Sequence, residues 1–166
     1  MKIIFLYLFL LSFIFHFCAR TYTAADLEIR KSLIPGAGNG LFAKTEIPAQ
    51  VVLGQYGGEM LSQSMYDALI PTNSTEYVML LHPCALKNSA GIMAIDGKNG
   101  NIFSRINYAP EEFQNVTYVH LCEPPYTQIR TMRKILKDEE LYMDYGGAYD
   151  YSFMEFPEVK KFFRLK

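Results

Sequence analysis

Short β-rich segments separated by turns follow one another along most of this sequence, and they constrain its fold more than any other feature. These segments are LEIRK (27–31), VVLGQY (51–56), EYVMLL (76–81), GIMAIDGKNGN (91–101), NVTYVHL (115–121), TQIRTMRKIL (127–136) and EELYMDY (139–145). Helical signals are confined to SQSMYDAL (62–69) and to FPEVKKFFRL (156–165), in which Phe156, Val159 and Phe163 share one face. No strand–helix–strand alternation repeats. The sequence therefore predicts a mainly β domain with minor helix rather than a doubly wound sheet.

A hydrophobic segment at the N-terminus stands apart from this pattern. Lys2 precedes an apolar run from Ile3 to Phe17, and small residues follow near Cys18. The run is shorter than the roughly 20 residues of a membrane span, and its build is typical of a secretory signal peptide. The alternatives are an uncleaved anchor and a gene-model error that joins a leader to a soluble domain. In each case residues 1–22 are kept out of the fold prediction.

Composition and charge narrow the classes of function. A chain of 166 residues can form one domain with a core, and a net charge of −1 provides no basic field that would attract nucleic acid or anionic lipid. Cys84 and Cys122 have neither CxxC spacing nor a histidine at zinc-ligand spacing, so we expect no metal site. His82 and His120 stand alone and are interpreted as structural or surface residues.

Three glycines in PGAGNGLFAKTEIP, at positions 36, 38 and 40, superficially suggest a dinucleotide-binding loop. Such a loop must open a helix whose N-terminus faces phosphate, and no amphipathic helix follows here. Two interpretations stay open: a glycine turn between two strands, or a loop whose bare backbone lies against a ligand.

A second unusual stretch, DEELYMDYGGAYDYSF (138–153), gathers five aromatic residues around a Gly-Gly pair. A packed core can use the rings but has little need of so many hydroxyls, which raises the question of whether they serve chemistry.

Four stretches, taken in order, carry a resemblance to a known family. They are GAGNGLFA, YGGE at Tyr56, INYAPEEFQN at Ile106, and DEELYMDYG. Their order, separation and residues resemble the SET-domain protein lysine methyltransferases, over nearly all of the chain from Leu27 to Asp150. The segment IDGKNGNIFSRINYAPEEFQNV is most similar to the PR-domain branch, whereas TQIRTMRKILKDEELYMDYG is similar to mono-methylating histone enzymes. The resemblance implies a SET fold of short sheets with a knot-like C-terminal crossing.

The resemblance also implies an activity, a cofactor and site residues. The activity is methyl transfer from S-adenosylmethionine to the side-chain amine of a protein lysine, in a histone or another protein or peptide. Tyr145 matches the tyrosine beside the transfer centre, and Tyr56 and Tyr118 match tyrosines of the lysine channel. The implied cofactor-binding residues are Ala37, Gly38, Asn39, Gly40, Asn107, Tyr108 and Phe156, with Phe153 as an alternative to Phe156 for covering the adenine.

Further tyrosines of the C-terminal stretch receive different interpretations. Tyr149 and Tyr151 lie beyond the core motif and are expected to help close the pocket. Tyr142 is expected to pack on the opposite face of its strand from Tyr145, because side chains alternate along a strand.

The chain departs from the family pattern at several points. Tyr108 follows the motif asparagine where the family usually has histidine, and Arg105 lies two residues before Asn107 rather than three. The gap from Asn107 to Asn115 is longer than in the family pattern. Because no cysteine-rich segment follows Gly147, the zinc site of the family is not expected here. Tyr108 and the position of Arg105 favour an alternative, a catalytically weak or inactive SET or PR-like protein-interaction module. The tyrosines at positions 56, 118 and 145 oppose it. A secreted β-rich domain of unrelated role is a third hypothesis.

Localisation is a point of conflict in the sequence. The leader suggests the secretory pathway, in which the sequons at Asn73 and Asn115 would be glycosylated, whereas the resemblance suggests the nucleus or cytoplasm. No direct nucleic acid binding is expected, and membrane association only if the leader is retained as an anchor. The predicted organisation is a leader (1–22), a SET domain (27–150) and a C-terminal helical tail (151–166).

Overall fold

A computed structural model describes residues 20–72, 74–147 and 149–165 of the chain. Residues 1–19 of the predicted leader, and Asn73 of the first sequon, therefore lie outside the described residues. The strands are β1 (Leu27–Lys31), β2 (Asn39–Ala43), β3 (Val52–Gly54), β4 (Glu59–Ser62), β5 (Val78–Leu80), β6 (Ile92–Asp96), β7 (Asn107–Tyr108), β8 (Val116–His120), β9 (Thr127–Thr131) and β10 (Tyr142–Met143). The α-helices are α1 (Gln63–Leu69), α2 (Pro83–Leu86) and α3 (Pro157–Phe163). Within the described residues, no helix is long and apolar enough to cross a bilayer.

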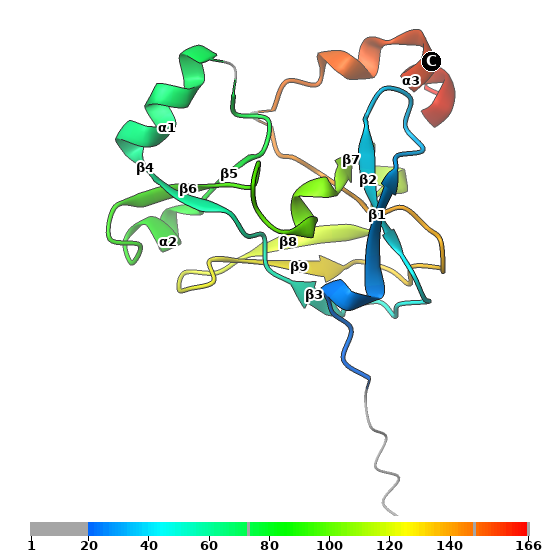
Figure 1. The fold of residues 1–166 in the computed structure, drawn as a ribbon, viewed down its shortest axis with the longest axis horizontal. Coiled ribbons are helices and arrows are strands. Elements are labelled where there is room, and N and C mark those ends of the chain that lie inside the picture. Colours follow the sequence, from blue (N-terminus) through cyan, green and yellow to red (C-terminus); the bar gives the residue numbers. More distant parts are fainter. Residues whose placement is uncertain (1–19, 73, 148, 166) are drawn as a thin grey trace, which may run out of the picture.

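The strands form four small sheets, which confirms the predicted mainly β fold with minor helix. Two sheets have three strands each, in the orders β3-β9-β8 and β4-β6-β5, and two have two, β1-β2 and β10-β7. In Figure 1 the β4-β6-β5 sheet and α1 lie on one side of the molecule, and the β1-β2 hairpin and α3 lie on the other. The β3-β9-β8 sheet runs beneath both.

Side-chain alternation explains the central strand of the lower sheet. Thr127, Ile129 and Thr131 of β9 are fully buried, and the residues between them are half-buried. The predicted strand continued to residue 136, but β9 ends at Thr131. The hydroxyl of Thr131 accepts from the Val51 amide at 2.8 Å and donates to the Pro48 carbonyl at 2.8 Å, so it fixes the neighbouring segment at the strand end.

The glycine-rich stretch forms the turn of the β1-β2 hairpin, so the interpretation as a turn between two strands is confirmed. Gly36 and Gly38 have φ of +79° and +72°, which favour glycine over residues with a side chain. The hairpin register pairs Leu27 with Ala43 and Lys31 with Asn39. Strand β2 is not among the β-rich segments predicted from the sequence, and its last four residues are buried.

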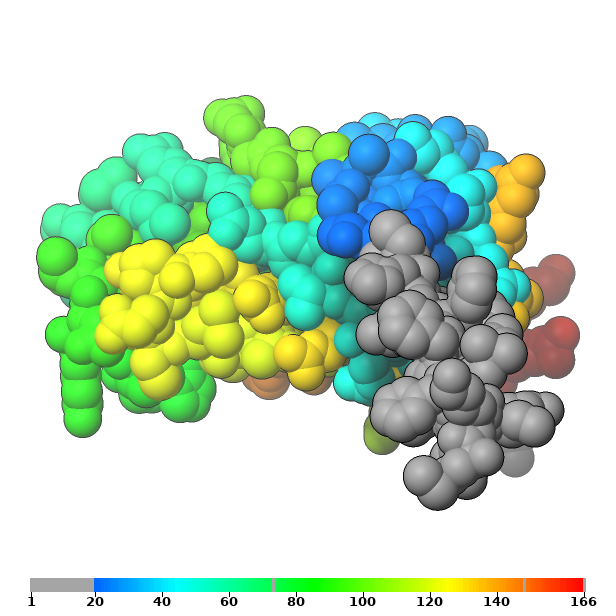
Figure 2. Space-filling model, turned by 90° about the horizontal axis from the view of Figure 1, so that it is seen from below, coloured from blue at the N-terminus to red at the C-terminus, as the bar shows by residue number. Residues whose placement is uncertain are grey.

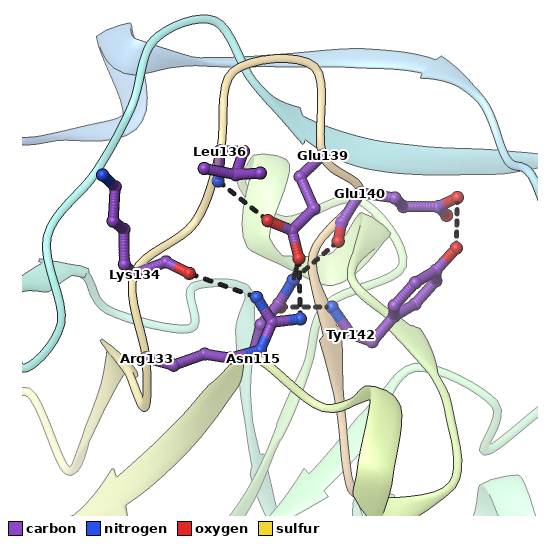
Figure 3. A network of polar contacts seen from close by, with 7 residues as sticks. All are labelled: Asn115, Arg133, Lys134, Leu136, Glu139, Glu140 and Tyr142. Atoms are coloured by element: carbon purple, nitrogen blue, oxygen red, sulfur yellow. Dashed lines mark hydrogen bonds and ion pairs between the residues drawn. The ribbon is translucent and has the colours of Figure 1, made fainter.

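The motif asparagine segment and the C-terminal stretch lie side by side. Strands β7 and β10 pair in parallel, with Asn107 opposite Tyr142 and Tyr108 opposite Met143. The buried side chain of Asn115 donates to the Glu140 carbonyl at 2.8 Å and accepts from the Tyr142 amide at 2.9 Å (Figure 3). We call the segments 107–115 and 139–143 together the crossing. Their contact agrees with the implied arrangement, and the knot-like threading itself stays a prediction.

Asn115 also corrects one expectation from the sequence. Its exposed fraction is 0%, and its amide nitrogen donates to both the Glu140 carbonyl and the Glu139 carboxylate. A glycan needs that nitrogen and open space around it, so Asn115 cannot carry one in the folded protein.

A second, smaller core lies behind the crossing. It contains Ile34, Ala109, Tyr142, Val159 and Phe163, so it packs helix α3 against the hairpin turn and β10. Tyr142 belongs to this core and not to a cavity, which confirms the prediction that it faces away from Tyr145.

Candidate active site

A cavity of about 610 Å³ lies between the hairpin turn and the C-terminal segment, and we call it the glycine pocket. Its lining includes most of the residues expected to bind a cofactor: Ala37, Gly38, Asn39, Asn107, Tyr108 and Phe156, together with Phe153. Phe156 is 55% exposed at its edge. The volume lies within the range of roughly 300–1,000 Å³ that is usual for small-molecule sites.

Gly40 does not line this pocket, unlike the other residues of the predicted set. It is a buried residue of β2, where a Cβ atom would overlap the carboxylate of Glu140 and lie 3.2 Å from the amide nitrogen of Asn107. Glycine at this position therefore allows the crossing to approach the hairpin closely.

A second cavity, of about 790 Å³, is lined by tyrosines, and we call it the tyrosine pocket. The three tyrosines predicted to be catalytic, Tyr56, Tyr118 and Tyr145, all line it. They come from the segment after β3, from β8 and from the segment after β10, so segments distant in the sequence place three phenols around one space.

The two pockets share a wall. Glu76, Tyr77, Ser104, Tyr145, Tyr149 and Phe153 line both of them. Tyr145 packs on Tyr149 in an edge-to-face arrangement with ring centroids 4.7 Å apart. The two cavities therefore adjoin at these residues, and a ligand in each pocket would meet its neighbour there.

Two of the predicted tyrosines are fixed by hydrogen bonds to the backbone. Tyr56 donates its hydroxyl hydrogen to the Tyr77 carbonyl at 2.6 Å, and Tyr145 donates to the Ile106 carbonyl at 2.8 Å. Each phenolic oxygen has given up its one hydrogen and keeps lone pairs that can accept. The pair therefore offers two oriented acceptors to the tyrosine pocket.

The pKa values of these phenols are raised, so all of them stay protonated at neutral pH. Burial is the largest cause for Tyr56, Tyr118 and Tyr145. The charge of Asp96 raises the pKa of Tyr56 further, and Asp144 does the same for Tyr118. No phenolate is ready to act as a base, and the chemistry of the pocket must come from positioning.

Tyr108, which stands where the family has histidine, belongs to an aromatic cluster at the edge of the glycine pocket. Its ring lies 4.5 Å from that of Tyr151 and 5.9 Å from that of Tyr145, measured between centroids. Tyr151 does not line either cavity and donates to the Gly146 carbonyl at 2.7 Å. Two tyrosines were expected to close the pocket. Tyr149 lines both cavities, whereas Tyr151 supports the ring of Tyr108.

We call the part of the tyrosine pocket that is lined by His82 and His120 its outer wall. The sequence alone does not show that these residues meet. Cys84 and Cys122 form a disulfide, and His82 and His120, two residues before each of them, both line the pocket. The imidazole centroids are 5.4 Å apart. Figure 2 shows the surface of the yellow β8–β9 segment beside the green segment that contains α2 and β6.

The two histidines have distinct roles in this wall. His82 caps α2, since its Nδ1 accepts from the Cys84 amide at 3.2 Å. Burial, and then the neighbouring His82, lower the pKa of His120. Their interpretation as structural residues fits the cap of His82, but both also face the cavity.

Tyr77, Tyr66 and Glu76 line the tyrosine pocket and were not singled out in the sequence. Tyr77 and Glu76 belong to a stretch that reads as a plain strand, and no local signal marks them. Within the described residues, no group of three or more His, Cys, Asp or Glu side chains is placed to hold a metal ion.

Two comparisons with known proteins bear on the family and the fold of this chain. A family model described as SET domain matches residues 38–146. A solved structure described as "ctPRC2 in an autoinhibited conformation bound to S-adenosylmethionine" contains a chain with a TM-score of 0.61 and 22% identity. The match covers 82% of the present chain and 16% of that chain, so the present chain corresponds to a small part of it, and the likeness is one of fold.

Proposed function

Because the chain belongs to the SET domain family, we propose that it transfers a methyl group from S-adenosylmethionine to the side-chain amine of a lysine in a protein or peptide. The observation that carries this proposal is the shared wall. Tyr145 and Tyr149 line both the glycine pocket and the tyrosine pocket, so a methyl donor in one would face an amine in the other.

The residues of the glycine pocket fit the proposed cofactor. The turn at Gly36 and Gly38 brings backbone close to the cavity, and Asn107 offers a polar side chain for the amino-acid end of the ligand. Phe153 and Phe156 offer rings that can cover an adenine. When bound, S-adenosylmethionine supplies a methyl group on a cationic sulfur.

The tyrosine pocket would bind the lysine side chain and orient its amine. A neutral amine has two N–H donors and one lone pair. If the hydroxyl oxygens of Tyr56 and Tyr145 accept those two hydrogens, the lone pair is directed away from both hydroxyls and is free to attack a methyl carbon. Rate enhancement would then come from holding the reacting atoms in line.

The lysine must lose its ammonium proton before the transfer. Burial among aromatic rings disfavours the charged form, as does a cationic ligand in the adjacent pocket, so the pKa of the bound lysine falls. The phenols are already protonated, and the proton leaves to water at the mouth of the pocket. The phenolic pocket then excludes water from the neutral amine.

The substrate class is a lysine-containing protein or peptide, and a histone is one candidate. A catalytically weak or inactive interaction module is the second candidate function. The observation that favours it is Tyr108. The family pattern usually has a smaller histidine imidazole at this position, whereas the larger phenol ring of Tyr108 packs against Tyr145.

One pair of assays on this chain distinguishes these functions. We expect calorimetry to detect saturable binding of S-adenosylmethionine, and radiolabelled methyl transfer to reach histones or members of a lysine peptide library. Binding without transfer to any lysine would support the interaction module. Absence of binding at millimolar ligand would overturn the enzyme proposal and the cofactor together.

A further inference from the structure

Glu140 is a buried carboxylate at the centre of the crossing. Its exposed fraction is 1%, and four donors point at its two oxygens. Oε1 accepts from the Ser32 hydroxyl at 2.7 Å and from the Asn107 amide at 3.0 Å. Oε2 accepts from the Leu33 backbone amide at 2.7 Å and from the Tyr142 hydroxyl at 2.8 Å. Two donors on each oxygen is the hydrogen-bonding pattern of a carboxylate, which has only acceptors.

This negative charge has no cationic partner in the described part of the chain. The ion pairs found there, such as Arg133 with Glu139 at 2.7 Å, do not include Glu140. The charge raises the pKa of the Tyr142 hydroxyl, after the larger effect of burial. A buried charge that is stabilised only by neutral dipoles attracts a cation in its vicinity more strongly than an exposed one does.

Glu140 also determines which way the Asn107 side chain faces. The amide nitrogen of Asn107 donates to Glu140 and to the Asn39 carbonyl at 3.1 Å. Both partners are acceptors only, so the nitrogen and oxygen of this amide cannot be exchanged. Both amide hydrogens are therefore used, and Oδ1 is the polar atom that Asn107 has left for a ligand of the glycine pocket.

We propose that Glu140 is a positioning residue for the cofactor: it holds the Asn107 amide so that Oδ1 accepts from the cofactor's ammonium group, and its unpaired charge favours a cationic over a neutral ligand. This inference rests on the proposed function and deepens it. S-adenosylmethionine carries a sulfonium, whereas the product S-adenosylhomocysteine has a neutral sulfur. The charge of Glu140 would therefore favour substrate over product and assist exchange after transfer.

The test is calorimetry on the chain with Glu140→Gln and the matched control Asp138→Asn. The control removes a nearby negative charge that is exposed, that Arg30 pairs at 3.1 Å, and that does not touch Asn107. We expect Glu140→Gln to weaken binding of S-adenosylmethionine about tenfold and binding of S-adenosylhomocysteine about threefold or less. Asp138→Asn should change either affinity less than about twofold.

Equal loss of affinity for both ligands in Glu140→Gln would refute the charge preference, and no loss for either would refute the positioning role. Failure of the wild-type chain to bind S-adenosylmethionine at all would instead overturn the proposed function and this inference with it.

A crystal structure of the wild-type chain with S-adenosylhomocysteine provides a second test that holds if Glu140→Gln does not fold. We expect Asn107 Oδ1 within hydrogen-bond distance of the ligand's ammonium nitrogen, while Nδ2 stays on Glu140. An Asn107 nitrogen that donates to the ligand's carboxylate would contradict the proposal.

Discussion

The crossing and the outer wall of the tyrosine pocket lie at the two ends of the candidate site, and they are held in place by different means. In the crossing, Asn115 and Glu140 are buried and are joined by hydrogen bonds to segments far away in the sequence. In the outer wall, helix α2 has only four residues and is joined to the turn after β8 by the Cys84–Cys122 disulfide. The exposed Asn88 adds hydrogen bonds to the Cys122 carbonyl and to Glu123.

This difference separates two requirements of the site. The crossing supports the glycine pocket and the shared wall, and its hydrogen bonds form in any aqueous compartment. The outer wall shapes the part of the tyrosine pocket next to the two histidines, and its covalent bond needs oxidising conditions. We therefore expect cofactor binding to depend on the crossing and peptide binding to depend on the wall.

Removal of the Asn115 side chain should have the largest effect on the crossing. Asn115→Ala leaves the Tyr142 amide and the Glu140 carbonyl buried without these partners, at a cost of about 3–4 kcal/mol of unfolding free energy. Urea denaturation monitored by circular dichroism measures this loss. The matched control in the outer wall is Asn88→Ala, whose exposed hydrogen bonds should cost less than about 1 kcal/mol. Equal effects of the two changes would contradict the contrast between buried and exposed networks.

Loss of the disulfide should have the next largest effect, confined to the wall. Cys84→Ser with Cys122→Ser opens a loop with a sequence separation of 38 residues and should lower the unfolding free energy by about 3 kcal/mol. We expect the KM for a peptide to rise several-fold while the Kd for S-adenosylmethionine is unchanged. A reductant should lower the Tm of the wild-type chain and leave that of the double variant unchanged. If cofactor binding weakened as much as peptide binding, the crossing and the outer wall would not act independently.

The smallest expected effect concerns His120 of the outer wall and the pH dependence of folding stability. Burial and His82 lower the pKa of His120, so the folded chain resists a proton that the unfolded chain accepts. Stability should therefore decrease as pH falls from about 7.5 through the unfolded value of about 6.5, by less than about 1 kcal/mol. His120→Gln should remove this component in thermal melts recorded between pH 5.5 and 7.5. A variant with the same pH profile as wild type would show that His120 is not responsible.

Patterns with local causes could be predicted from the sequence. Strands β1, β6 and β8 fall within the predicted segments, and so do helices α1 and α3. The predicted strand at residues 139–145 shortens to Tyr142–Met143, because β10 pairs with only two residues of β7. The polar side chains of Asn115 and Glu140 supply the other contacts there, and such contacts leave no periodic signal.

Features that depend on long-range contact could not be predicted. The disulfide joins two cysteines with no characteristic spacing, and only the fold shows that His82 and His120 meet beside it. The burial of Glu140 could not be predicted, because it comes from the hairpin residues Ser32 and Leu33, more than 100 positions earlier. The family resemblance predicted three of the tyrosines that line the tyrosine pocket, whereas nothing in the sequence marks Tyr77, which lines both cavities.

The most direct test of the central claim, that Tyr145 orients an amine at the boundary of two pockets, is single-turnover methyl transfer by Tyr145→Phe. The variant keeps the ring and removes the hydroxyl that is fixed by the Ile106 carbonyl. Tyr126→Phe is the control, since Tyr126 is buried in the core and lines neither pocket. We predict that Tyr145→Phe lowers the transfer rate about 100-fold with the Kd for S-adenosylmethionine within about threefold of wild type, and that Tyr126→Phe transfers at the wild-type rate. A Tyr145→Phe variant that methylates lysine as fast as the wild-type chain would contradict the account.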